Sequence, residues 1–357
     1  MNYVMLKDVC AINMGQSPDS KSYNDTGDGV PFFQGNADFG ARYPVTRKWC
    51  SEPTKMAAPN DILISVRAPI GAMNYARENC CIGRGLAALT PDKSKALPEF
   101  IFWLLKGKNA ELNSKGTGST FKAISRKVLE EIMIPEISLE KQIEFSEILE
   151  RVYGVIQARK EELQKLDELI KARFVELFGD PRSNPFGFEK KMLKDTCKVI
   201  TGNTPSRAIA EYYGDYIEWI KTDNIVSGIL NPTQATESLS EKGMNVGRTV
   251  EKDSILMACI AGSIASIGRV CITDRIVAFN QQINAVVPEQ YNILFLYVLL
   301  QMSKDYLVED INMALKGILS KSKLEEKEFI IPPMDLQEQF SDFVKQVDKS
   351  KFINQLL

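Results

Sequence analysis

The sequence predicts an α+β protein made of two similar globules, each followed by a long helix, with the two helices paired antiparallel between the globules under a pseudo-two-fold axis. Three observations predict this fold class. An uninterrupted helical stretch lies near the middle of the chain, short β-type runs broken by turn residues flank it, and one set of motifs occurs twice in the same order.

The helical stretch runs from Ser138 to Phe178. Ser138 is a typical N-cap, and Gly179-Asp180-Pro181 ends the helix because glycine adopts the left-handed cap and proline cannot continue. At 1.5 Å per residue the helix is about 60 Å long. Its apolar residues follow steps of three and four, which form a narrow seam typical of pairing with one other helix. A linker helix on a domain surface is the alternative.

The predicted seam joins this helix to a second one that begins at Asp335. Its members are Ile148, Val152, Val155, Leu163, Leu166, Ile170, Phe174, Phe340, Val344 and Val347.

Short strands and one short helix are predicted in the first globule. The clearest strand covers residues 61–67, with further strands at 30–33 and 86–89. Residues 98–106 predict a helix with proline in its first turn.

Motifs of the first globule recur in the second, and chance similarity is the alternative to a true repeat. The matched segments are Met5–Asp8 with Met192–Asp195, Met14–Pro18 with Thr201–Pro205, Asp61–Ser65 with Asp253–Met257, Gly85–Pro91 with Gln282–Pro288, Ala123–Ser125 with Ile318–Ser320, Leu129–Glu131 with Leu324–Glu326, and Pro135, Leu139 and Gln142 with Pro332, Leu336 and Gln339. The expected domain boundaries are 1–137, 138–179, 180–334 and 335–357.

Composition excludes several classes of site. The chain has no histidine, so a Ser-His-Asp site, a Cys-His site and His-ligated zinc are excluded, and no metal site is expected. Seven cysteines without a Cys-x-x-Cys pair predict reduced thiols and a cytoplasmic protein. No apolar run reaches the length of a membrane span, and the start lacks the layout of a secretion signal. The net charge is −2, so any nucleic-acid surface must be locally basic.

Catalytic motifs are also missing. Residues 184–187 resemble a methyltransferase motif but lack its second proline, and residues 116–120 lack the Gly-Lys-Ser/Thr ending of a phosphate-binding loop. Nuclease chemistry has no support, because Pro18-Asp19 and Pro91-Asp92 lack a Glu-x-Lys partner. We therefore expect no catalytic residue and no cofactor in this chain.

The duplicated motifs resemble the specificity subunit of type I restriction-modification systems. They are the Lys-Asp start, the Gly-x-Ser/Asn/Thr-Pro loop, the Asp-x-Ile-Leu strand, the Gly-Ser-Ile segment at 262–264 and the Pro-x-x-x-Leu-x-x-Gln opening of each helix. The resemblance covers nearly the whole chain. It implies two target recognition domains, at 1–137 and 180–334, held apart by the paired helices. The second helix, at 335–357, is shorter than the family pattern, which predicts a truncation or a gene rearrangement.

The same resemblance implies function and partners. The subunit would bind double-stranded DNA at a bipartite, asymmetric target with an unread spacer, without catalysis of its own. Two adenine methyltransferase subunits would methylate the target, and restriction-translocase subunits would complete the complex. S-adenosylmethionine and ATP are expected in those partner subunits.

Candidate DNA-binding residues lie on loops at matching places in both halves, because Arg, Lys, Asn, Gln, Ser and Thr are the types that reach base edges or phosphates. They are Gln16, Ser17, Gln34, Asn36, Arg67, Arg84, Lys115, Thr117, Ser119 and Lys122 in the first half, and Asn203, Thr204, Lys221, Asp223, Asn224, Arg269, Gln281, Gln282, Lys316 and Lys321 in the second. An ordinary solvated loop is the alternative for each. Trp219 is expected in the core.

Two other functions compete with DNA recognition. One is a coiled-coil adaptor whose two globules bind proteins, and the other is a self-contained restriction enzyme, which the missing motifs disfavour. The steep salt dependence of phosphate contacts would separate DNA binding from the adaptor.

Overall fold

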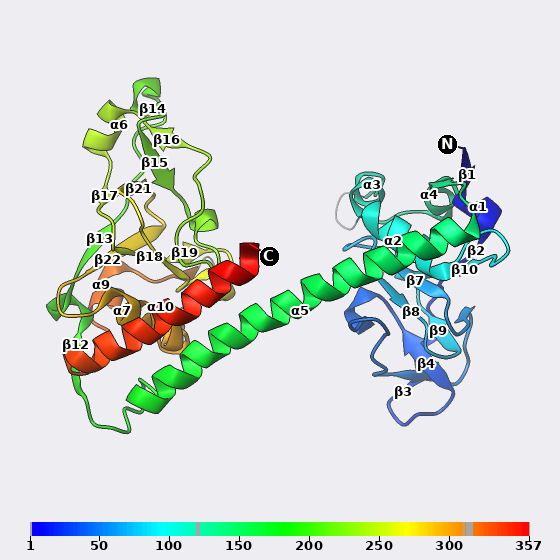
Figure 1. The fold of residues 1–357 in the computed structure, drawn as a ribbon, viewed down its shortest axis with the longest axis horizontal. Coiled ribbons are helices and arrows are strands. Elements are labelled where there is room, and N and C mark those ends of the chain that lie inside the picture. The colour runs from blue at the N-terminus through cyan, green and yellow to red at the C-terminus, as the bar shows by residue number, and fades with distance from the viewer. Residues whose placement is uncertain (1, 119–121, 310, 312–316, 357) are drawn as a thin grey trace. The chain divides into compact units, whose positions relative to one another are not determined.

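The computed structural model describes residues 2–118, 122–309, 311 and 317–356 (Figure 1). The chain divides into two compact units, residues 1–157 (unit 1) and 158–357 (unit 2). Each unit contains strands and helices, so the predicted α+β class is confirmed.

Unit 1 holds a four-stranded antiparallel sheet in the order β2-β10-β7-β8 and a five-stranded sheet in the order β3-β5-β4-β9-β6. Strand β1, at the start of the chain, pairs with β11, which directly precedes the long helix. The strands are β1 (Tyr3–Met5), β2 (Cys10–Met14), β3 (Tyr23–Asn24), β4 (Val30–Phe33), β5 (Trp49–Cys50), β6 (Met56–Ala57), β7 (Ile62–Ser65), β8 (Met73–Tyr75), β9 (Cys80–Ile82), β10 (Leu86–Pro91) and β11 (Met133–Pro135). The helices are α1 (Leu6–Val9), α2 (Pro98–Gly107), α3 (Asn109–Ser114) and α4 (Arg126–Glu130).

Unit 2 repeats this plan with sheets in the orders β13-β22-β18-β20 and β14-β16-β15-β21-β17, and β12 pairs with β24 as β1 pairs with β11. The strands are β12 (Glu189–Met192), β13 (Cys197–Thr201), β14 (Tyr213–Gly214), β15 (Ile217–Ile220), β16 (Ser238–Leu239), β17 (Thr249–Val250), β18 (Ile255–Ala258), β19 (Ile260–Ala261), β20 (Val270–Ile272), β21 (Val277–Phe279), β22 (Ile283–Pro288), β23 (Gly317–Ile318) and β24 (Glu328–Ile331). The helices are α6 (Glu241–Val246), α7 (Ile293–Met302), α8 (Lys304–Val308), α9 (Lys321–Glu325) and α10 (Met334–Leu356).

The predicted repeat is present in three dimensions, with two changes of register. Leu89 pairs with Ile62 in unit 1, and Val286 pairs with Ile255 in unit 2, so Ile62 and Ile255 are counterparts. The predicted match of Asp61 with Asp253 is therefore one residue out of register. The true counterparts are Asn60 and Asp253, and both have a left-handed backbone, with φ of 70° and 64°. Asn and Asp tolerate that conformation better than other non-glycine residues.

The second correction concerns the helix openings. Gln142 and Gln337 are both buried, and each side-chain oxygen accepts a backbone N–H at the N-cap of an earlier helix, from Leu97 before α2 at 2.9 Å and from Asn292 before α7 at 3.0 Å. Gln337, not the exposed Gln339, is therefore the counterpart of Gln142. These glutamines tie each long helix to the body of its own unit.

The central helix α5 (Leu139–Phe178) is unbroken, as predicted. The Lys141 N–H donates to the Ser138 hydroxyl at 3.4 Å, and Gly179 closes the helix with φ of 71° and an N–H bond to the Val175 carbonyl at 2.8 Å. These contacts confirm the predicted cap and stop.

The helix pair forms inside unit 2. Ile170, Phe174 and Phe178 of α5 share one buried cluster with Phe340, Val344 and Val347 of α10. The Phe174 and Phe340 rings lie 5.6 Å apart, and Lys351 bonds Asp167 at 2.7 Å, so α10 runs antiparallel to this part of α5 (Figure 1). Leu166 packs against the same cluster, and Leu163 is half-buried.

The remainder of the predicted seam is exposed, and its pairing with a helix stays a prediction. Ile148, Val152 and Val155 lie in unit 1 and are exposed. Their spacing fits a seam, but spacing alone does not show whether a partner helix is present.

Candidate nucleic-acid interface

Three loops meet at the same place in each unit. In unit 1 the first loop follows β2, the second follows β4 and the third joins β9 to β10. The Gln16 N–H donates to the Ile82 carbonyl at 3.0 Å, and the Gly83 N–H donates to the Phe33 carbonyl at 2.8 Å. In unit 2 the corresponding bonds run from Asn203 to Phe279 and from Asn280 to Ile220.

The glycine of each Gly-x-Ser/Thr-Pro motif has a steric role. A Cβ built on Gly15 would lie 2.2 Å from the Gly83 carbonyl oxygen, and one on Gly202 would lie 2.2 Å from the Asn280 carbonyl oxygen. Only glycine lets the first loop approach the third this closely. The motif therefore brings the loops together, and the residues beside it carry the polar side chains.

In unit 1 the side chains at this site are Ser17, Gln34 and Arg84. The Gln34 amide donates to the Ser17 hydroxyl at 2.9 Å, and the Arg84 backbone N–H donates to the same oxygen at 3.3 Å. Gln34 and Arg84 are exposed. The Arg84 guanidinium has no hydrogen bond or ion pair with any described residue, so its donors are free for a ligand.

In unit 2 the same three places hold Thr204, Lys221 and Gln281. The Thr204 hydroxyl donates to the Gln281 side-chain oxygen. Lys221 pairs with Glu237 and lies 5.1 Å from the centre of the Trp219 ring. Trp219 is buried, as expected.

Sequence reasoning missed Arg207 and Glu237 in unit 2. Arg207 bonds Glu237 at 2.6 Å and lies over the Tyr213 ring at 4.4 Å. Hydrogen bonds from Lys221 and then from Arg207 lower the pKa of the Glu237 carboxyl. A carboxylate that orients two cations could not be found from sequence, because Arg207, Lys221 and Glu237 share no motif spacing.

The other predicted residues of unit 1 fall into two groups. Thr117 and Arg67 form backbone bridges to Ala123, beside Lys122, and all three predicted side chains are exposed. The Val66 N–H, next to Arg67, donates to the Gly85 carbonyl at 2.9 Å, which connects this group to the three-loop site. Lys115 instead pairs with Glu111 on α3 at 2.8 Å. Gln16 and Asn36 lie on the first and second loops, and Ser119 is outside the described residues.

In unit 2 several of the predicted side chains have structural partners. Asn224 is buried and caps its own turn, because its side-chain oxygen accepts the Lys221 N–H at 3.0 Å. The Arg269 guanidinium donates to the Ser266 and Thr222 carbonyls, both at 3.2 Å.

The remaining unit 2 candidates are placed as follows. Asn203 donates to the Val246 carbonyl at 2.9 Å, and Lys321 pairs with Glu325 at 3.5 Å. Asp223 and Gln282 lie on the second and third loops, and Lys316 is outside the described residues.

The structure offers no alternative site of obvious chemistry in its described part. All seven cysteines are buried free thiols, and burial raises the pKa of Cys259 to about 12, so its reactive thiolate is suppressed. No cluster of three or more Cys, Asp or Glu could hold a metal ion among the described residues. None of the described helices has the length and apolarity needed to cross a membrane.

The chain thus contains two copies of one α+β unit, with unlike polar side chains at the same three-loop site. A family model described as type I restriction modification DNA specificity domain matches residues 1–168 and again residues 185–357. The chain therefore belongs to the type I restriction-modification specificity family, as the sequence motifs indicated.

Individual relatives agree. A putative type I restriction enzyme MjaX specificity subunit of Methanocaldococcus jannaschii is 42% identical over 157 residues, 44% of this chain and 37% of that protein. The MjaIX specificity subunit of the same organism is 25% identical across 98% of this chain and 87% of its own length. The first of these matches thus spans little more than a third of the relative.

A solved structure shows the fold. The type I restriction-modification S subunit from M. genitalium is 14% identical, with a TM-score of 0.59 over 99% of this chain and 91% of that one. At that identity the likeness concerns the fold alone.

Proposed function

We propose that each unit reads one half-site of a bipartite DNA target, and that the two half-sites differ in sequence. The observation that carries this proposal is the shared three-loop site, which holds Ser17, Gln34 and Arg84 in unit 1 but Thr204, Lys221 and Gln281 in unit 2. An arginine can contact guanine O6 and N7 with two hydrogen bonds, and a glutamine can contact adenine N6 and N7. Because the two units carry different side chains on the same three-loop backbone, we expect them to prefer different bases.

We further propose that α5 determines the length of the unread spacer. It is one continuous helix of 40 residues, about 60 Å long at 1.5 Å per residue. Gln142 anchors it in unit 1, and Phe174 and Phe178 anchor it in the core of unit 2. Because DNA advances about 34–36 Å per turn, a helix of this length corresponds to between one and two turns of duplex.

The proposal includes partners that carry out the chemistry. Two methyltransferase subunits with S-adenosylmethionine would methylate adenines in the target, and ATP-dependent restriction-translocase subunits would complete a cytoplasmic complex. The family and the names of the relatives support this division of labour.

Co-expression with the cognate methyltransferase, followed by single-molecule methylation mapping, tests the function. The expected result is a single motif of two unlike half-sites around a spacer of fixed length. A continuous motif, or a palindromic one, would contradict it. If no methylation appears, a gel shift of the complex at low and high salt decides: binding that does not weaken with salt would favour the protein-binding adaptor.

A further inference from the structure

Two aromatic side chains of unit 2 hold the first loop of the three-loop site in place. The Tyr213 hydroxyl donates to the Pro205 carbonyl at 2.6 Å, and the Trp219 indole N–H donates to the Asn203 carbonyl at 3.3 Å. The two rings meet close to edge on, with centroids 6.1 Å apart. They therefore fix the backbone on both sides of Thr204.

The same loop continues to Arg207, whose guanidinium is held from two sides. It lies 4.4 Å from the centre of the Tyr213 ring and 5.2 Å from that of Trp219, and it donates to a Glu237 carboxylate oxygen at 2.6 Å. The side chain is 56% exposed, and its other N–H donors have no hydrogen-bond partner among the described residues. A guanidinium carries five N–H donors in one plane, so two of the remaining donors can bind one ligand together.

The fold does not require an acid at the position of Glu237. The Trp219 N–H donates to the Glu237 carbonyl at 3.1 Å, and in unit 1 the Phe32 N–H donates to the Lys48 carbonyl at 2.9 Å. Trp219 and Phe32 are counterparts, because each pairs with the middle residue of the parallel neighbouring strand, β21 in unit 2 and β9 in unit 1. One backbone position therefore carries a carboxylate in unit 2 and an ammonium in unit 1.

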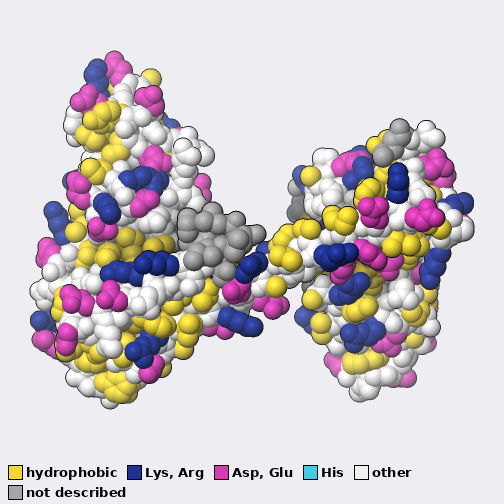
Figure 2. All heavy atoms as spheres, viewed as in Figure 1, with side chains coloured by type: hydrophobic (Ala, Val, Ile, Leu, Met, Phe, Trp, Pro, Cys, Tyr) yellow, Lys and Arg dark blue, Asp and Glu magenta, His cyan; other side chains and the backbone are white. Residues whose placement is uncertain are grey.

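Unit 2 carries this carboxylate at the three-loop site although an acid repels the phosphates of DNA. On the visible face of unit 2 around β14, β16 and α6, basic and acidic side chains are interspersed (Figure 2), so contacts made there depend on how single cations are placed. Stability does not explain the acid, because exposed ion pairs contribute little to folding. Glu237 does provide orientation, since one of its oxygens holds Arg207 and the other holds Lys221.

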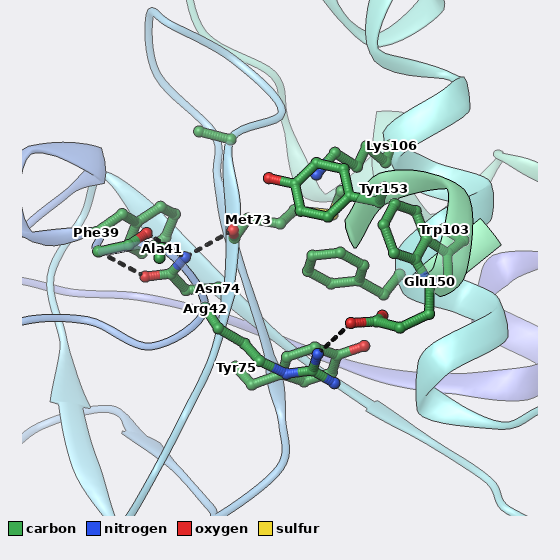
Figure 3. A pocket seen from close by; sticks show the side chains of 13 residues that line it. Phe39, Ala41, Arg42, Met73, Asn74, Tyr75, Trp103, Lys106, Glu150 and Tyr153 are labelled. Atoms are coloured by element: carbon green, nitrogen blue, oxygen red, sulfur yellow. Dashed lines mark hydrogen bonds and ion pairs between the residues drawn. The ribbon is translucent and has the colours of Figure 1, made fainter. Parts of the chain in front are cut away.

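An arginine with similar neighbours occurs elsewhere in unit 1. Arg42 pairs with Glu150 at 2.5 Å and lies 5.4 Å from the centre of the Tyr75 ring, in a hollow of about 250 Å³ (Figure 3). Glu150 belongs to α5, so this arginine links the long helix to unit 1. The position of Arg207 on the first loop, and not the arrangement alone, therefore points to a DNA contact.

We propose that Arg207 reads a guanine in the half-site of unit 2, and that Glu237 is a positioning residue that fixes the Arg207 guanidinium for this contact. Two N–H donors of the guanidinium bind guanine O6 and N7, while Glu237 and the Tyr213 ring hold the side chain in place. Because Arg207 is restricted before DNA binds, less side-chain entropy is lost on binding. The inference rests on the proposed function and names the residue pair that determines one base pair of the target.

The test measures base discrimination by the complex with the cognate methyltransferase. Methylation mapping first gives the target, and fluorescence anisotropy then gives affinities for fluorescein-labelled duplexes that carry the target, the target with each base pair changed in turn, or an unrelated sequence. Arg207→Met is expected to reduce discrimination about tenfold or more at a single G·C pair. Glu237→Gln is expected to reduce it about threefold or more at the same pair. Binding of this second variant to the unrelated duplex should become tighter, because a negative charge is removed.

A double-mutant cycle shows whether Glu237 acts through Arg207. In the Arg207→Met background, Glu237→Gln is expected to change discrimination less than about twofold. Glu211→Gln is the matched control, because it removes the same charge from an exposed ion pair of unit 2, the pair with Lys242. It is expected to leave discrimination at every base pair within about twofold of the wild-type value.

Several outcomes would overturn the proposal. They are unchanged discrimination in Arg207→Met, effects of the two variants at different base pairs, equal effects of Glu237→Gln in both backgrounds, and a loss at every base pair of one half-site, which would indicate a purely structural role. If the wild-type complex itself shows no half-site for unit 2, the proposed function fails and this inference fails with it. The two failures are distinguishable, because only the second is seen with the wild-type protein.

Discussion

The rings of Phe174 and Phe340 meet edge to face, with centroids 5.6 Å apart, and neither side chain is accessible to solvent. This contact joins α5 to α10 inside unit 2. Phe340→Ala should therefore destabilise unit 2 by about 3–5 kcal/mol, the usual cost of removing a buried phenylalanine ring. The matched change Phe145→Ala, at the exposed counterpart in unit 1, should cost about 0.5 kcal/mol or less. Urea unfolding monitored by circular dichroism measures both, and equal costs would contradict the difference in packing.

Gln337 should contribute to stability in a way that Gln339 does not. The Gln337 side chain accepts the Asn292 N–H at 3.0 Å and donates to the Pro332 carbonyl at 2.8 Å while fully buried. Gln337→Ala leaves both backbone groups without this partner, which should cost about 1–3 kcal/mol. Gln339→Ala is the control, and it should be neutral because Gln339 is exposed. If Gln339→Ala lowered the unfolding temperature more than Gln337→Ala, Gln339 would be the counterpart of Gln142, as expected from the sequence.

The length of α5 should control the spacer of the DNA target. Insertion of one helical turn next to the exposed Glu161 lengthens the helix by about 5.4 Å. We expect methylation mapping to show the same two half-sites around a changed spacer. A substitution at Glu161 without insertion should leave the motif as it is. Altered half-sites with an unchanged spacer would refute the spacer role.

Alkaline pH should destabilise the fold through its buried thiols. Burial raises the pKa of Cys10, Cys80, Cys197 and Cys271 from the ordinary value of 9.0 to about 12. The unfolded chain therefore loses these protons first, so the contribution to stability is complete below pH 9 and is lost as the pH rises towards 12. Chemical unfolding between pH 7 and 10.5 measures this loss. Replacement of Cys197 and Cys271 by alanine should make the free energy of unfolding depend less on pH over this range, whatever the replacement does to stability at pH 7.

Much of the fold could be predicted from the sequence because its signals are local. The cap at Ser138, the left-handed Gly179 and the repeat of the Gly-x-Ser/Thr-Pro motif each follow from short-range stereochemistry. The register errors arose where short motifs were matched by residue type, since Asp61 resembles Asp253 in type whereas Asn60 shares its backbone conformation.

The site was harder to predict, because a residue type does not reveal its partner. Asn224 is of a residue type that can contact a base, but its side-chain oxygen already accepts a hydrogen bond from the Lys221 backbone N–H. Arg207 forms an ion pair with Glu237, which lies thirty residues further along the chain. Likewise, seam spacing cannot distinguish Phe340, which is covered, from Phe145, which is not.

The central claim is that unlike side chains on one three-loop frame read unlike half-sites. Its most direct measurement is methylation mapping of the triple variant Thr204→Ser/Lys221→Gln/Gln281→Arg, which gives unit 2 the side chains that unit 1 carries at the same three places, co-expressed with the cognate methyltransferase. The account predicts that the half-site read by unit 2 changes while the half-site read by unit 1 and the spacer stay the same. An unchanged motif with full methylation, or a change confined to the half-site of unit 1, would contradict it.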